Sequence, residues 1–104
     1  VMPRKISGLI NLIETLQKQQ KESVDNGVVL WYGKIIAFSV LTLLRMVVKH
    51  DYTHCASTLQ ILKKDKVFPL MKFRESFDNL LRINLLNFNP RLYCVLLHIT
   101  NKLK

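Results

Sequence analysis

Apolar residues recur at intervals of three and four along most of this chain, which is the spacing of one face of an α-helix. The longest such stretch, Gly33 to Lys64, consists of a long apolar segment, a break at His50–Tyr52 and a shorter amphipathic segment. Two helices joined by so few residues fold back antiparallel on one another. The pattern therefore predicts an all-α fold built on a helical hairpin.

The same spacing predicts five helices in all. They span Pro3–Glu22, Val28–Lys49, Thr53–Lys63, Pro69–Ile83 and a fifth segment that starts at Pro90. The expected breaks are Ser23–Gly27, His50–Tyr52, Asp65–Lys66 and Asn87–Asn89. Asp51 and Asn89 are the N-cap candidates, because short polar side chains accept hydrogen bonds from the free N–H groups of a first helical turn. Pro90 suits the position after such a cap.

The second segment is apolar on most sides, so we expect it to be the central core helix, enclosed by the others. In the third segment Cys55, Ala56, Leu59 and Leu62 are expected to face inward. The stripe of the fourth consists of Leu70, Phe73, Phe77, Leu80 and Leu81, and that of the fifth of Leu92, Val95, Leu96, Ile99 and Leu103. If the chain belongs to a longer array, its first and fifth helices should keep partly apolar outer surfaces.

The composition fits one helical domain over residues 1–104, which we expect to be part of a longer protein. Hydrophobic residues make up 49%, which excludes disorder for most of the chain, and three glycines and three prolines are too few for a turn-rich β fold. The net charge is +9. An excess of this size favours acidic or polyanionic partners, including nucleic acid.

Cys55 and Cys94 lie in apolar helical patterns, so we interpret both as buried reduced thiols. Reduced thiols fit an intracellular protein, nuclear or cytoplasmic. The apolar run Ile35–Leu44 is bracketed by Lys34 and Arg45 and is too short for a bilayer, which needs about 20 residues. We therefore expect no membrane partner.

The sequence lacks the common catalytic and phosphate-binding motifs, so we expect no enzyme activity and no cofactor. One metal site is conceivable: His54, Cys55, Cys94 and His98 could converge as the four ligands of a structural zinc ion. The alternative is that both cysteines belong to the core and both histidines to the surface. We favour that alternative and expect no metal.

Basic residues around the third and fourth helices are the better candidates for binding. They are Lys63, Lys64, Lys66, Lys72 and Arg74. Such cations can contact phosphates or an acidic peptide. Trp31 and Tyr32 follow a loop, and we expect them to pack on the domain's own core; if they are exposed, they are the preferred anchors for a partner.

The segment His50–Leu62 resembles the turn and second helix of a tetratricopeptide-type repeat. A short turn that ends in an aromatic residue, Tyr52, precedes a helix with a small residue, Ala56, four positions on. The resemblance covers one hairpin of about 30 residues, and no second copy stands at the 34-residue spacing of that family. It implies a fragment of an α-solenoid as the alternative to a compact bundle, with scaffolding or peptide binding as the usual role.

Together these observations predict an all-α domain that acts as a scaffold or adaptor in protein–protein interaction, binding a helical or acidic peptide segment. Self-association through the first or fifth helix is a variant. Direct binding of nucleic acid through the same positive charge is the alternative.

Overall fold

The computed structural model describes residues 4–68, 70 and 77–103. Within them the fold is an all-α bundle of five helices: α1 (Arg4–Glu22), α2 (Asn26–His50), α3 (Cys55–Lys64), α4 (Phe77–Phe88) and α5 (Pro90–Leu103). A 3₁₀ turn, Tyr52–His54, joins α2 to α3. The predicted fold class is confirmed.

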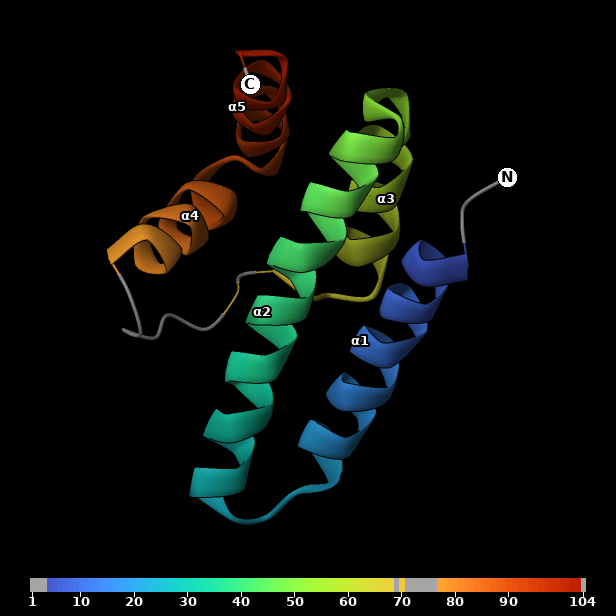
Figure 1. Cartoon of the computed structure of the whole chain (residues 1–104). Coiled ribbons are helices and arrows are strands. Elements are labelled where there is room, and N and C mark those ends of the chain that lie inside the picture. The colour runs from blue at the N-terminus through green and yellow to red at the C-terminus, as the bar shows by residue number, and fades with distance from the viewer. Residues whose placement is uncertain (1–3, 69, 71–76, 104) are drawn as a thin grey trace.

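Helix α2 is the centre of the bundle, as predicted, and it contacts each of the other four helices. α1 runs antiparallel along most of its length, α3 folds back along its second half, and α4 and α5 lie on its other side (Figure 1). Ala37, Val40, Leu43, Leu44 and Val47 of α2 are completely buried. The apolar perimeter of this helix therefore has a neighbour on each side.

The ends of α2 and α3 are set by side chains close in the sequence. Asp25 caps α2 by accepting from the backbone N–H groups of Gly27 (2.7 Å) and Val28, so the helix begins at Asn26 rather than at the predicted Val28. Asp51 ends α2 and caps the 3₁₀ turn by accepting from the backbone of Thr53 at 3.0 Å. Its predicted capping role is confirmed.

Helix α3 buries Cys55, Leu59 and Leu62 as predicted, but Ala56 is exposed and Thr58 is buried in its place. The hydroxyl of Thr58 donates to the carbonyl of His54, which satisfies its hydrogen bond locally and lets it enter the core. The helix stops at the predicted Asp65–Lys66 break, where Lys66 has a φ of 59°.

The predicted fourth helix, Pro69–Ile83, differs from the structure at its start and at its end. Leu70 is not helical, α4 continues past Ile83 to Phe88, and the expected loop shrinks to Asn89; Pro69 lies outside the described residues. The cause is Asn87, whose side chain accepts from the backbone N–H of Leu70 at 2.6 Å and donates to its carbonyl at 2.9 Å. This pairing holds Asn87, a residue type common in loops, within the last turn of α4.

The buried face of α4 also differs from the prediction. Ile83 and Leu86 are completely buried, whereas Leu81 is 54% exposed. Phe73 lies outside the described residues. Helix α5 starts as predicted, with the Asn89 side chain accepting from the backbone N–H of Leu92 at 3.2 Å.

Candidate functional site

The outer face of α5 is an apolar surface that the described part of the fold leaves uncovered. The stripe assigned to this helix from its sequence points away from the bundle. Its members and their exposed fractions are Leu92 (40%), Val95 (36%), Leu96 (42%), Ile99 (47%) and Leu103 (83%). At about 1.5 Å of rise per residue the stripe extends roughly 16 Å along the helix. We call it the α5 outer face.

A second, smaller set of α5 residues holds the helix against the bundle. Tyr93 and Cys94 are buried, and Leu97 is partly buried against the core. Burial raises the pKa of the Tyr93 hydroxyl. Because α5 is apolar on opposite sides, it packs on the bundle with one side and presents the other to solvent.

The Cys94 thiol lies beside the Cys55 thiol of α3. This contact lowers the pKa of Cys55 and, with burial, raises that of Cys94. Both cysteines are buried free thiols, as predicted. They tie α5 to α3 at the centre of its inner side and leave the outer face free.

The charged side chains of α5 and of the chain just before it have one sign. Arg91 and Lys102 flank the stripe at its two ends, and residues 79–104 contain four Lys or Arg residues and no Asp or Glu. A carboxylate on a partner therefore meets no repulsion from the side chains of this part of the chain.

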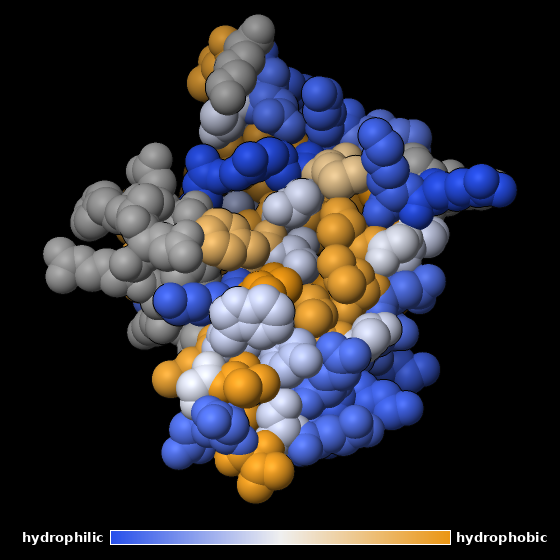
Figure 2. Space-filling view, turned by 60° about the horizontal axis from the view of Figure 1, so that its bottom comes forward, coloured by the Kyte–Doolittle hydropathy of each residue, from blue (hydrophilic) through white to orange (hydrophobic). Residues whose placement is uncertain are grey.

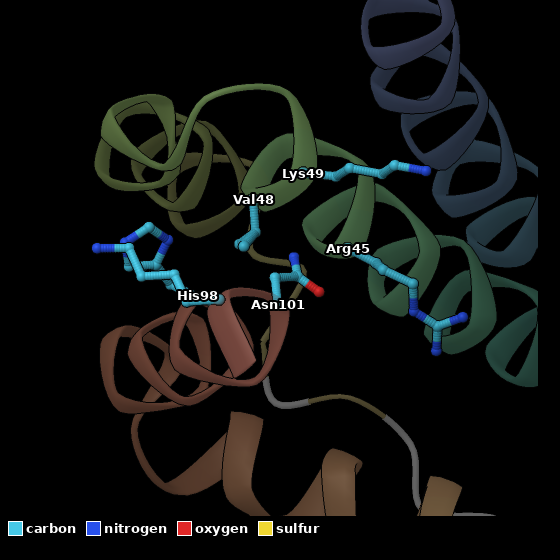
Figure 3. Close-up of a pocket in the computed structure, with 6 residues that line it drawn as sticks. Arg45, Val48, Lys49, His98 and Asn101 are labelled. Carbon is cyan, nitrogen blue, oxygen red and sulfur yellow. The ribbon is translucent and has the colours of Figure 1, made fainter. Parts of the chain in front are cut away.

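A trough of about 560 Å³ lies between the last turns of α2 and α5. Its lining residues are Arg45, Val48, Lys49, His98, Asn101 and Lys102. Val48 and Asn101 lie between the two helices, while Arg45 and Lys49 extend away from His98 (Figure 3). We call this hollow the α2–α5 trough; it holds three full positive charges, and no carboxylate lines it.

A smaller groove of about 360 Å³ lies on the α3 side of α5, lined among others by Tyr52, Arg91 and Val95. The Tyr52 ring stacks on the His98 ring with 4.2 Å between ring centroids. Because Tyr52 lines the groove and His98 lines the trough, this stacked pair lies between the two hollows.

The cations predicted as contacts lie elsewhere. Lys63, Lys64 and Lys66 are exposed at the end of α3. The hollow beside them, about 500 Å³, is also lined by Glu14 and Asp65, so its charge is mixed. A hydrogen bond to Asp65, and its negative charge, raise the pKa of the Glu14 carboxyl. Lys72 and Arg74 lie outside the described residues.

The other predicted contacts, Trp31 and Tyr32, divide between surface and core. Tyr32 packs against the core as expected, but Trp31 is 56% exposed, and the two rings meet edge to face at 5.2 Å. Val24, Val28 and Leu30 are exposed near it, and Figure 2 shows apolar patches among hydrophilic side chains in a view toward this end of the molecule. The role of Trp31 as a partner anchor stays a prediction.

The histidines and cysteines considered as zinc ligands do not converge. Cys55 and Cys94 meet in the core, His98 stacks on Tyr52, and His54 Nδ1 lies 3.3 Å from an Asp51 carboxylate oxygen. In the described part of the chain no three His, Cys, Asp or Glu side chains are placed to share a metal ion.

Among the described residues, α2 is the one helix whose length and composition would let it cross a membrane. The core helix of a soluble bundle has the same properties. Ten residues of α2 are buried by the surrounding helices, and they include Leu43, Leu44, Val47 and Val48. This packing supports the interpretation of α2 as a core helix, and the absence of a membrane partner stays a prediction.

No protein-family model matches the chain, and no curated protein or solved structure does so either. The described helices give no evidence of a repeat, so the resemblance to tetratricopeptide-type hairpins stays a prediction. The exposed faces and hollows described above are therefore the basis for inferring a function.

Proposed function

We propose that this chain is a helical protein-interaction domain that binds an acidic amphipathic helix of a partner protein on the α5 outer face. The single observation that carries the proposal is the uncovered aliphatic stripe of α5, bordered by cations and free of carboxylates. An amphipathic helix laid on such a face buries its own apolar side at the same time. Its carboxylates then meet Arg91 and Lys102 at the rim, where they speed encounter.

The size of the stripe bears on affinity. Its five side chains together expose as much as about two and a half fully exposed aliphatic residues. Covering them contributes roughly 4–7 kcal/mol, at about 1.5–3 kcal/mol for each Val, Leu or Ile side chain. Association itself costs about 4–15 kcal/mol. The stripe alone therefore supports only weak binding, and a specific partner needs further contacts nearby.

Charge argues against a second copy of this chain as the occupant. In an antiparallel pair of α5 helices, Arg91 would lie near Lys102 of the copy; in a parallel pair, Arg91 would lie near Arg91. Both arrangements bring like charges together, which weakens association. A partner helix that carries Asp and Glu beside its apolar stripe has complementary charge.

The proposal is tested by selecting binders from a display library of random 16-residue peptides on the intact chain. Expected binders carry apolar residues at i, i+3 or i+4 and i+7, with Asp and Glu on the flanks. Leu96→Glu should weaken their binding at least tenfold. Leu12→Glu is the matched control, because Leu12 on α1 is 43% exposed against 42% for Leu96, and it should leave binding unchanged.

Two outcomes would contradict the proposal. Binders that tolerate Leu96→Glu but are lost on Trp31→Ala would place the interaction on the start of α2 instead. A chain that dimerises in light scattering, and returns to a monomer on Leu96→Glu, would give the α5 outer face to a second copy.

A further inference from the structure

We infer that the α2–α5 trough receives several carboxylates of the bound segment and so selects a partner whose helix continues into an acidic stretch. This inference rests on the proposed function and deepens it, because it names what the partner must carry beside its apolar stripe. The trough adjoins the α5 outer face through Lys102, which lines the trough and flanks the stripe.

The charge balance of the trough is positive after the helix ends are counted. The C-termini of α2 and α5 each contribute about half a negative charge. Arg45, Lys49 and Lys102 contribute three full positive charges, and the lining has no acidic side chain. By these values the positive charge of the lining residues exceeds the negative charge of the two helix ends.

The positive region continues beyond the trough. Lys49 also lines a neighbouring hollow of about 270 Å³ between the start of α1 and the end of α2, together with Lys5 and His50. No carboxylate lines that hollow either. A basic band therefore extends from α5 across the last turn of α2 to the first turns of α1.

The arrangement of the side chains favours an extended ligand over a single ion. Arg45 and Lys49 reach away from His98, and Val48 and Asn101 lie between them (Figure 3). Because these side chains point in different directions, they cannot all contact one phosphate or another single small anion. Several carboxylates spaced along a peptide can each meet one of them, with the Asn101 amide as a neutral donor.

The same lining disfavours nucleic acid as the ligand. Single-stranded nucleic acid gains much of its affinity by stacking bases on aromatic rings. The one aromatic ring in the lining belongs to His98, and it already stacks on Tyr52. The adjoining α5 outer face is aliphatic and offers no stacking surface.

The experiment titrates the intact chain with a decaglutamate peptide and follows backbone amide resonances by NMR at low and moderate salt. Decaglutamate has no apolar side chain, so it reports on the trough alone. Binding should shift the amides of His98 and Asn101 and weaken with salt. The double variant Arg45→Gln, Lys49→Gln should bind roughly tenfold more weakly, as expected for the loss of two partly exposed ion pairs.

Lys63→Gln, Lys64→Gln is the matched control, because it removes the same charge from the end of α3, outside the lining of the trough, and should change the affinity less than about twofold on the exposed-pair scale. Equal weakening by both double variants would overturn the inference, since only net charge would then matter. Failure of decaglutamate to shift His98 and Asn101 would also overturn it. Tighter binding of a ten-residue oligothymidylate at the same amides would assign the trough to nucleic acid and overturn it too.

The two proposals fail separately. If selected peptides still need Leu96 but decaglutamate does not bind, the trough inference is wrong and the docking face stands. If decaglutamate binds at the trough but no selected peptide depends on Leu96, the proposed function is wrong.

Discussion

The buried side of α2 and the outer face of α5 allow a sharp test by the same substitution at one leucine in each helix. Leu44 in α2 is completely buried, whereas Leu96 in α5 is 42% exposed. The sequence pattern places both on apolar helix stripes and so does not distinguish them. The structure does, and Leu44→Ala and Leu96→Ala should therefore have very different effects on stability.

Leu44→Ala removes a side chain enclosed on all sides and leaves a cavity, which costs about 2–5 kcal/mol. Leu96→Ala removes atoms that are already half in water, and alanine is the better helix former, so the loss should stay below about 1 kcal/mol. A domain of this length is stable by only about 5–15 kcal/mol. Leu44→Ala thus removes a large share of the total, and Leu96→Ala a small one.

Urea unfolding followed by far-ultraviolet circular dichroism measures both losses. With a slope of about 1–3 kcal/mol per molar urea, the midpoint should fall by roughly 1–3 M for Leu44→Ala and by well under 1 M for Leu96→Ala. An unchanged slope would show that both variants unfold from the same native fold. Equal losses at the two positions would refute the account, because Leu96 would then be a core residue.

Three further predictions concern single contacts. Asn89→Ala should lower the free energy of unfolding by about 1 kcal/mol, and Asn89→Gly by only a few tenths, because the side chain caps α5; equal stability of Asn89→Ala and the original chain would contradict this. Asn87→Ala should cost about 2 kcal/mol by urea unfolding, because it leaves the backbone N–H and carbonyl of Leu70 without their partner; a loss as small as that of an exposed alanine substitution would contradict the pairing. Hydrogen bonds from the Thr53 side chain and backbone lower the pKa of the Asp51 carboxyl in the folded chain. The carboxylate therefore stabilises the fold above the pKa of an unfolded aspartate, about 3.9. This stabilisation is lost as the pH falls through the lower pKa of the folded chain. Asp51→Asn should therefore lower the urea midpoint at pH 7, and the difference from the original chain should vanish at strongly acidic pH; a difference that grows on acidification would contradict the assignment.

Features set by neighbouring residues could be predicted from the sequence. Asp51 and Asn89 cap the segments that follow them, and the apolar perimeter of α2 identifies the central helix. Each depends on residues within a turn or two. Local hydrogen bonding and the 3.6-residue period are enough to indicate them.

Features set by distant residues could not. Asn87 has the character of a loop residue until Leu70, 17 positions earlier, takes up its side chain. In α5 the larger aliphatic stripe is the natural choice for the core, but Tyr93 and Cys94 pack inward instead, and Cys94 lies beside Cys55 of α3. A helix with apolar residues on both sides has no single face that periodicity can select.

The candidate site shows the same limit. Arg45 and Lys49 of the α2–α5 trough are more than 50 positions from Lys102 in the sequence, whereas Lys63, Lys64 and Lys66 are close together in the sequence and so attract attention first. In the fold Lys64 and Lys66 line a hollow together with Glu14 and Asp65. The sequence alone does not show which acidic residues lie near a group of cations, because that depends on how the helices pack.

The central claim is that the α5 outer face is open and binds a partner helix. Methyl-labelled NMR of the intact chain, titrated with a selected acidic peptide, tests it most directly. The account predicts that the methyl resonances of Leu92, Leu96 and Ile99 shift while that of Leu12 does not. Shifts at Leu12 or around Trp31 with none on α5 would contradict it.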